Sequence, residues 1–233
     1  MKMKCLFLCL AGAFVSCSDT DECKEYDLKG EVKSSFAKFY GVEKKDGEWV
    51  KGNILYRHNR VIFDKKGLLQ EVEHYNEHIF LTGKTIPTRK KGKIVEESYY
   101  DKDRDFVEKT IFKHISKNEI DFERFSSNGE KFRYGKTIRK NGKKTSKSTT
   151  FMYRDDEFRE DIELFEYDKD DNLISVETTD EEGEITVSVR YEYLEFDAKG
   201  NWTKRLMFEI HHKHRDYRVS EPVCIETREI EYY

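Results

Sequence analysis

Histidines come closest, in type and spacing, to forming a metal site in this chain. His211, His212 and His214 are its densest histidine cluster. On a β-strand, His212 and His214 would point the same way about 7 Å apart, because each residue advances the chain by about 3.3–3.4 Å. A neighbouring carboxylate would then complete a weak site. Surface histidines in a charged strand are the simpler interpretation, so we expect no metal and no cofactor.

Other chemical patterns fail on spacing. His74 and His78 would chelate one ion on a helix, but on a strand they would lie about 13 Å apart. The segment Gly129–Thr137 has five residues between its glycines, whereas a phosphate-binding loop has four and a following helix. With 47 acidic residues, chance carboxylate pairs are expected and none stands out. We therefore expect a protein that is not an enzyme.

Trp49 and Trp202 are the candidates for stacking on a sugar ligand. Tryptophan offers a large flat apolar face with a polar N–H at its edge. The alternative is that both are ordinary core residues, since large aromatic side chains are mostly buried.

A charged and then apolar segment begins the chain. Lys2 and Lys4 precede an apolar run from Cys5 to Val15. This is the order of a secretory signal, and the run is shorter than the about 20 residues that a membrane-spanning helix needs. Residues 14–17 (FVSC) resemble the lipobox of a bacterial lipoprotein signal, although leucine is usual at the first of these positions. The resemblance implies cleavage after residue 16 and a lipid on Cys17.

An acidic tract, Ser18–Glu22, follows Cys17. It is similar to the export tags that carry Bacteroidota lipoproteins to the outer face of the outer membrane. We therefore expect residues 1–16 to be a signal peptide and residues 17–30 to be an acidic lipidated tether. The expected location is the outer membrane, with the cell surface favoured over the periplasmic face, and the membrane is a partner through the lipid.

Two cysteines, Cys23 and Cys224, remain near the two ends of the mature chain. In an oxidising compartment one bridge between them would close nearly the whole domain and stabilise it by about 3–5 kcal/mol. Two separate thiols are the alternative, and the sequence leaves the choice open.

Charge dominates the composition. Charged residues make up 39% of the sequence, against about 25% in an average domain, but 14% aromatic residues supply the apolar surface of a folded core. Residues 31–233 fit a single domain. Without Lys2 and Lys4 the chain has 41 basic and 47 acidic residues, with the signs interspersed. The basic runs Arg89–Lys93 and Lys140–Lys147 are interpreted as solvated turn tips, so we expect no nucleic-acid partner.

Period-two alternation predicts strands. Four residues share one apolar face: Val187, Val189, Tyr191 and Tyr193. The phase slips after Tyr193, which predicts a β-bulge near Tyr193 and Leu194. A second slip predicts a bulge between Leu164 and Phe165. Beyond the next turn, four residues are expected to share a face: Trp202, Leu206, Phe208 and Ile210.

Turns that contain glycine, such as Asp46-Gly47 and Asn141-Gly142, separate these runs. The predicted fold class is therefore all-β: an antiparallel meander of successive hairpins in a sheet that is curved or partly closed. Two segments fit a helix as well as a strand. Phe106–Ile115 is expected to be a strand, and the state of Val32–Tyr40 is left open.

An aromatic residue followed by aspartate opens several turns. Phe63-Asp64, Tyr167-Asp168 and Phe196-Asp197 each precede a chain reversal. The aromatic residue would end a strand facing the core, and the aspartate would accept hydrogen bonds from turn N–H groups. The stretch Tyr191–Arg205 resembles the tyrosine–aspartate (YD, RHS-like) repeats of exported Bacteroidota lipoproteins. The resemblance implies a YD-repeat-like sheet and carries over no catalytic residue.

Together these features predict an exported, lipid-anchored envelope protein with a binding or scaffolding role toward an envelope protein or a glycan. A glycan-acting hydrolase and an immunity-type partner of a toxin are the alternatives. A cleft with convergent carboxylates of raised pKa would favour the enzyme. A flat exposed aromatic patch would favour the binding module.

Overall fold

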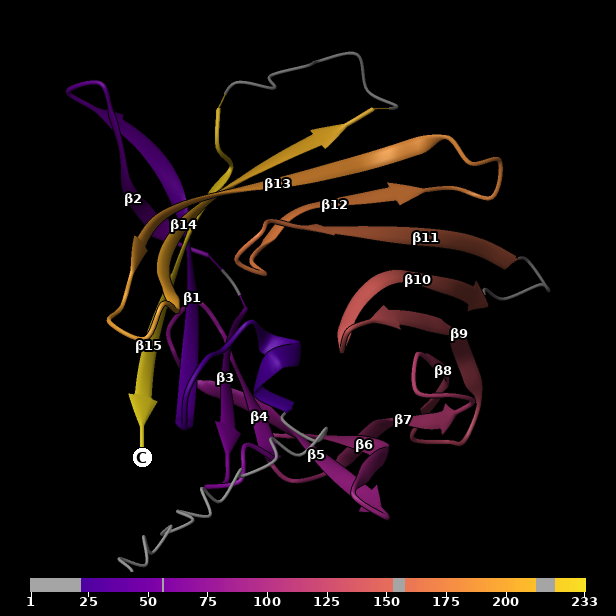
Figure 1. The fold of residues 1–233 in the computed structure, drawn as a ribbon. Coiled ribbons are helices and arrows are strands. Elements are labelled where there is room, and N and C mark those ends of the chain that lie inside the picture. The colour runs from indigo at the N-terminus through magenta and orange to yellow at the C-terminus, as the bar shows by residue number, and fades with distance from the viewer. Residues whose placement is uncertain (1–21, 56, 153–157, 213–220) are drawn as a thin grey trace, which may run out of the picture.

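A computed structural model describes residues 22–55, 57–152, 158–212 and 221–233. These residues fold as fifteen strands with one short 3₁₀-helix, η1 (Glu22–Tyr26) (Figure 1). The strands are β1 (Val32–Lys45), β2 (Glu48–Ile54), β3 (His58–Phe63), β4 (Leu69–Tyr75), β5 (Leu81–Lys90), β6 (Lys93–Asp101), β7 (Phe106–His114), β8 (Glu119–Ser126), β9 (Lys131–Lys140), β10 (Lys143–Met152), β11 (Phe158–Tyr167), β12 (Leu173–Thr179), β13 (Ile185–Phe196), β14 (Trp202–His211) and β15 (Cys224–Tyr232). In the described part of the chain, no helix has the length and apolarity needed to span a bilayer.

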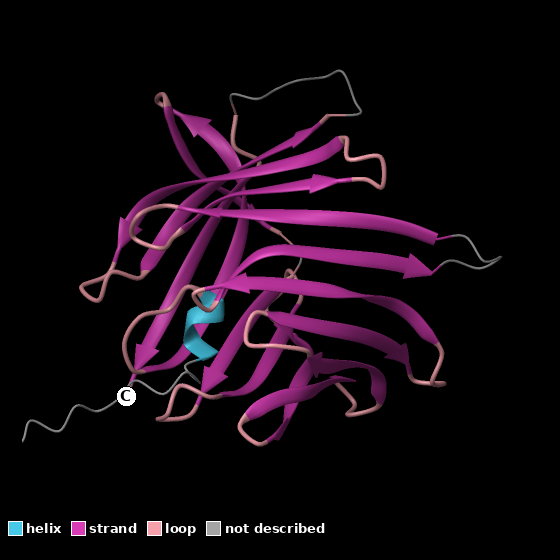
Figure 2. Ribbon diagram, turned by 45° about the vertical axis from the view of Figure 1, so that its right-hand side comes forward, coloured by secondary structure: helices cyan, strands magenta, loops and turns pink. Residues whose placement is uncertain are grey.

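The strands form one antiparallel meander that closes on itself (Figures 1 and 2). From β3 to β15 each strand pairs with its neighbour in sequence, and β15 pairs back with β1. This last ladder runs from Val32 opposite Tyr232 to Tyr40 opposite Ile225. The result is a β-barrel with β2 outside the ring. The predicted all-β meander is confirmed, and the sheet is closed.

β1 is long because it has two partners in succession along one edge. Its first half pairs with β3 and its second half with β2. At the junction a side chain replaces a backbone acceptor: Nδ1 of His58 accepts a hydrogen bond of 3.2 Å from the N–H of Phe39. The segment Val32–Tyr40, left open by the sequence, is thus a strand. The expected strand at Phe106–Ile115 is confirmed as β7.

Aspartate turns join many of the strands, as the sequence predicts. In the turn at residues 64–68, Oδ1 of Asp64 accepts hydrogen bonds from the N–H groups of Lys66 (2.8 Å) and Leu68 (3.0 Å). The same pair of bonds is made by Asp101, Asp168 and Asp197. The aromatic–aspartate pattern therefore marks strand ends through a definite hydrogen-bond mechanism.

The bulge expected after Tyr193 is confirmed by a register shift between Tyr193 and Glu195. The irregular pairing that follows also changes the side to which Trp202 points. Trp202 lies inside the barrel, whereas Leu206 and Phe208 pack on the outer surface. The expectation that these three residues share a face is therefore wrong for Trp202.

The bulge expected between Leu164 and Phe165 is wrong in its position. β11 stays in register through both residues, and the shift lies between Glu166 and Tyr167. Leu164 points outward and Phe165 inward. Apolar residues follow one another here because the wall carries apolar side chains on both of its faces.

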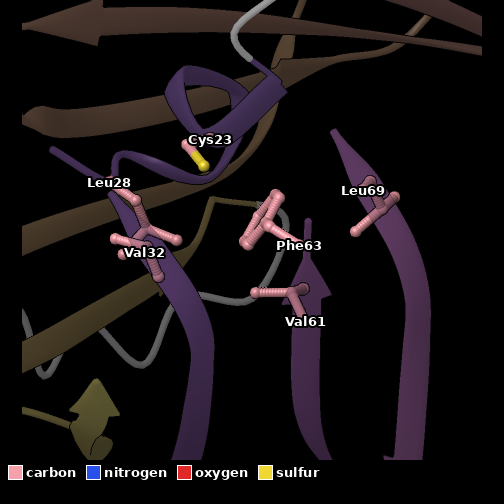
Figure 3. Packing of buried hydrophobic residues seen from close by; sticks show 6 residues of the cluster. All are labelled: Cys23, Leu28, Val32, Val61, Phe63 and Leu69. Atoms are coloured by element: carbon pink, nitrogen blue, oxygen red, sulfur yellow. The ribbon is translucent and has the colours of Figure 1, made fainter. Parts of the chain in front are cut away.

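η1 lies inside one end of the barrel (Figure 2). Glu22 binds Arg89 of β5, and Glu25 binds Arg139 of β9, each at 2.5 Å. These strands lie far apart around the ring, so only the interior brings one helical turn within reach of both. Cys23 of η1 forms a buried core with five other residues (Figure 3): Leu28, Val32, Val61, Phe63 and Leu69.

The barrel therefore has two distinct ends. The closed end, occupied by η1, carries the turns at residues 64–68, 90–93, 115–118, 140–143, 168–172 and 197–201. The opposite end, which we call the open end because no described helix lies within it, carries the described hairpin turns of the ring at residues 76–80, 101–105, 126–130 and 180–184. Because residues 22–30 pack at the closed end, this part of the expected tether belongs to the folded domain.

Two glycines within strands permit close contacts on the inner face. A Cβ on Gly135 would lie 2.0 Å from the carbonyl oxygen of Ser148 and 2.9 Å from the ring of Phe122. A Cβ on Gly83 would lie 2.6 Å from the ring of Tyr99. Each aromatic ring covers a glycine of the neighbouring strand, an arrangement that accommodates strong local curvature.

Replacing Gly135 by alanine should lower the free energy of unfolding by about 2 kcal/mol, because the new methyl group forces the backbone and Phe122 apart. Gly41→Ala is the matched control: it also lies in a strand, and its nearest neighbour would be 3.6 Å away. We expect the control to be neutral or slightly stabilising. Urea unfolding of both variants checks this, and equal midpoints would contradict the packing argument.

Candidate functional site

Side chains alternate between the two faces of a strand, so one residue of known direction on a strand shows which of its neighbours face the interior. Arg139 of β9 faces inward because it binds Glu25 of η1. Every second residue of β9 shares that side, and so do the residues directly opposite on β8 and β10. Arg89 gives the same starting point on β5, and the register extends the assignment around the ring.

The inner face of β8–β11 is basic. By this register, among the described residues of these strands, six basic side chains point inward: Arg124, Arg133, Arg139, Lys144, Lys147 and Arg159. Two acidic side chains do so, Asp161 and Glu163. Three phenylalanines share the face: Phe122, Phe151 and Phe165. We call this surface the inner basic wall.

Two arginines meet on the inner basic wall near the turn at residues 126–130. Arg124 and Arg133 lie directly opposite each other on β8 and β9, which by itself is unfavourable for like charges. Glu108 of β7 compensates through an ion pair with Arg124. The guanidinium of Arg133 lies 4.3 Å from the ring centre of Phe151, a cation–π contact that uses the aromatic face of the wall.

Both acidic side chains of the wall are paired within it. Asp161 accepts a hydrogen bond of 2.8 Å from Nε of Arg159. Glu163 lies 3.1 Å from Nζ of Lys147. Glu108 of β7 and Glu25 of η1 pair with two further cations of the wall, so six cations stand against four carboxylates and the wall as a whole stays basic.

Buried polar atoms of the wall that lack a hydrogen-bond partner include Nε of Arg124, Nε of Arg139 and Oγ1 of Thr149. Thr149 is 4% exposed. Buried polar groups are nearly always hydrogen-bonded. A ligand that carries a hydrogen-bond acceptor, or a water molecule, would satisfy these protein atoms if it bound next to them.

The apolar side chains along β9–β13 are less completely buried than those elsewhere in the barrel. The fully buried apolar residues come from the η1 segment and from strands β1, β3, β4, β8, β14 and β15, and among the described residues of β9–β13 there is none. Inward-facing Phe165 and Val189 remain partly exposed. Because a solid core would bury such residues completely, water reaches the inner basic wall.

At the closed end, in contrast, the charged side chains are paired or stacked within the packed core. Trp202 has no exposed surface and lies between Arg205 and Arg228, whose guanidinium carbons are 4.1 and 3.6 Å from its ring centre. Arg205 binds Glu226 at 2.6 Å. Burial lowers the pKa of Arg228 to about 10. Trp202 is therefore a core residue, and the stacking prediction does not hold for it.

Trp49 lies on the outer side of the barrel. It packs, partly buried, against the outer cluster of Leu206, Phe208 and Ile225. Nζ of Lys44 lies 5.0 Å from its ring centre. Stacking of Trp49 on a sugar stays a prediction, and it would occur away from the inner basic wall.

The histidines of the sequence do not converge. His212 hydrogen-bonds Oγ of Ser188 at 2.8 Å, and His214 lies outside the described residues. Both ring nitrogens of His74 are bonded to side chains of the neighbouring strands, at 2.9 and 2.8 Å, while His78 lies in an exposed turn. Within the described ranges, no group of three or more histidine, cysteine or acidic residues is arranged to hold a metal.

Cys23 and Cys224 are not joined to each other. The thiol of Cys23 lies in the closed-end core, 3.8 Å from the carbonyl oxygen of Gly67. Cys224 begins β15, where burial raises its pKa to about 11. The bridge that the sequence left open is therefore not formed between these two residues. Cys17, the predicted lipid site, lies outside the described residues.

The inner basic wall is the feature that sequence reasoning missed. The runs Arg89–Lys93 and Lys140–Lys147 are solvated at the turns themselves. Arg89, Lys144 and Lys147, however, lie on strands and point inward. The sequence signal of this wall is a basic residue at alternate positions of a strand, next to an aromatic residue. It can be interpreted only once the inner face of the barrel is known.

No known protein family and no curated protein matches the chain. Among solved structures, a porin-like protein from Bacteroides uniformis is similar at 9% identity over 88% of this chain and 99% of its own, with a TM-score of 0.49. A porin-like protein from Bacteroides vulgatus is similar at 10% identity over 87% and 98%, with a TM-score of 0.49. A LolA superfamily protein from Nitrosomonas europaea is similar at 9% identity over 93% and 92%, with a TM-score of 0.32. These comparisons assign no family, and the YD-repeat resemblance gains no support from them.

Two carboxyl groups beside η1 have raised pKa values. Burial raises the pKa of Glu97 on β6, and the carboxylate of Glu25 raises it further. Burial also raises the pKa of Asp27, against the opposing effects of Arg228 and Lys143. Because both groups adjoin η1 in the packed end, their shifts have a structural cause.

Glu97→Gln should raise the free energy of unfolding at pH 7. A raised pKa in the folded state means that folding disfavours the ionised form, so the cost appears as the pH rises through that pKa. The gain should vanish below about pH 4, where Glu97 is protonated in the unfolded chain too. Glu96→Gln, on the outer face of the same strand, is the control. Unfolding curves between pH 4 and pH 8 test this, and a gain that is independent of pH would contradict it.

Proposed function

We propose that this chain is an exported, lipid-anchored protein of the outer membrane whose barrel binds an anionic ligand that enters at the open end. The sequence of the first seventeen residues supports the export and the anchor. The inner basic wall carries the binding proposal. It combines cationic side chains, water access and unsatisfied polar atoms on one concave surface.

The chemistry of the wall favours a small anion with an apolar portion. Arginine presents a planar fork of donors that matches a carboxylate or a phosphate, and Arg124 and Arg133 lie side by side. Phe122 and Phe151 offer apolar contact within the same face. The size of such a ligand is limited, because it must fit inside the barrel.

The outer surface of the barrel favours a protein that binds a ligand in its interior. It disfavours the alternative, a pore embedded in lipid. Oppositely charged residues face each other across adjacent strands, such as Glu73 and Lys84 at 3.0 Å and Glu119 and Lys136 at 2.5 Å. A lysine or arginine on the lipid face of a membrane barrel costs about 2–4 kcal/mol near the bilayer midplane. Cross-strand ion pairs of this kind on the outer face are suited to water.

The hydrolase alternative has less support. An acid–base mechanism needs two carboxyl groups that flank a substrate, one of them with a raised pKa. Glu97 and Asp27 have raised pKa values but adjoin η1. On the wall, Asp161 and Glu163 are each paired with a cation. The immunity-type alternative rests on sequence resemblance alone, and capture of one toxin protein would establish it.

Binding is tested with 8-anilinonaphthalene sulfonate, an anionic aromatic probe. We expect a single site, and Arg124→Met with Arg133→Met should weaken it by about 10-fold or more, because a hydrogen bond to a charged group contributes about 1.5–3 kcal/mol. Lys109→Met with Lys136→Met removes the same charge from the outer face and should leave the affinity unchanged. Equal losses in the two double variants would place the site elsewhere. An array of acidic and neutral glycans then defines the natural ligand class.

The anchor is tested by metabolic labelling with a lipid precursor. Wild-type protein should incorporate the label, and Cys17→Ser should abolish it, because the modified thiol is gone. Cys23→Ser should still be labelled. Equal labelling of wild type and Cys17→Ser would remove the anchor from the proposal without affecting the binding site.

A further inference from the structure

The closed end of the barrel exposes a ring of lysines. The six turns at this end expose nine lysines: Lys65, Lys66, Lys90, Lys91, Lys93, Lys117, Lys140, Lys169 and Lys199. The same turns expose two acidic residues, Asp170 and Asp171. Three further aspartates of these turns are half-buried, with their carboxylates engaged by turn N–H groups. We call this surface the basic end.

The open end has the opposite charge. Its four described turns expose seven acidic residues: Glu77, Asp103, Asp105, Glu130, Glu181, Glu182 and Glu184. They expose two basic residues, Lys102 and Arg104. The charge of the barrel is thus separated along its axis, although the signs look interspersed in the sequence, because successive turns alternate between the two ends.

The start of the described chain lies at the basic end. Glu22 binds Arg89 and the N–H of Leu69 there, at 2.5 and 2.7 Å. Cys17 precedes Glu22 by five residues, which span at most about 18 Å when fully extended. A lipid on Cys17 would therefore hold the basic end, and no other part of the barrel, close to the membrane.

We propose that the basic end docks on an anionic phospholipid surface, so that the open end points away from the membrane. The docking builds on the proposed anchor but is carried by the lysines themselves. Each basic residue near an anionic bilayer contributes about 1 kcal/mol of attraction, and a ring of turn tips at one end of a barrel can meet a flat surface at several points at once. A linear polyanion would meet fewer of them.

The test uses the mature chain, residues 17–233 with Cys17→Ser, so that no lipid contributes. Sedimentation with vesicles of phosphatidylcholine and phosphatidylglycerol (3:1) at 50 mM salt should show binding. Binding should fall steeply at 300 mM salt, because screening shortens the reach of exposed charges. Vesicles of phosphatidylcholine alone should not bind.

Two variants with the same change of net charge separate the ends of the barrel. Lys66→Glu with Lys90→Glu at the basic end should weaken vesicle binding by at least about 30-fold, the effect of two lost contacts. Lys102→Glu with Arg104→Glu at the open end should bind nearly as the parent does. Circular dichroism of each variant shows that the fold is intact.

Several outcomes would overturn the docking. They are equal binding to neutral and anionic vesicles, equal losses in the two variants, and binding to heparin without binding to the vesicles, which would reassign the basic end to an acidic glycan. None of these depends on Cys17. Failure of lipid labelling and failure of docking are therefore separate results.

Discussion

The pairing of β1 with β15 is the constraint from which the remaining structure follows. It joins residues 200 positions apart, Val32 and Tyr232, and removes the two free edges that an open meander of this length would expose. Closure also gives every strand an inner and an outer face. The direction of each side chain is then set by its position in the ladder, and the inner basic wall exists because β8–β11 place alternate cations on the enclosed side.

Charged side chains inside the barrel are stabilised in two ways. At the closed end the ions are paired or stacked, as with Arg205 between Glu226 and Trp202, because an unpaired buried charge would cost several kcal/mol. Along β9–β13 several inward-facing side chains, among them Lys147, Arg159 and Phe165, remain partly exposed, so water still solvates them. The first arrangement forms a packed core, and the second is the surface that we propose binds a ligand.

Local features of this fold were predictable, and long-range ones were not. The aspartate turns and the bulge after Tyr193 follow from residue type and alternation within a few positions. Ring closure depends on two segments at opposite ends of the chain, which alternation cannot connect. Trp202 is misplaced by the sequence because the irregular pairing before Arg205 changes its side. The inward direction of Lys144 and Lys147 was also hidden, because both residues belong to a run that looks like an exposed turn.

The opposite charges of the two ends bear directly on which ligand can enter. The four described turns of the open end named above expose seven acidic residues, which would repel an approaching anion. Exposed charges are screened within about 8 Å at physiological salt, whereas the cations of the inner basic wall act in a partly enclosed space where screening is weaker. A small anion therefore has to cross only a thin repulsive layer. A polyanion would extend across the whole rim and be repelled along its length, so the same charge pattern that permits a small acidic ligand argues against nucleic acid.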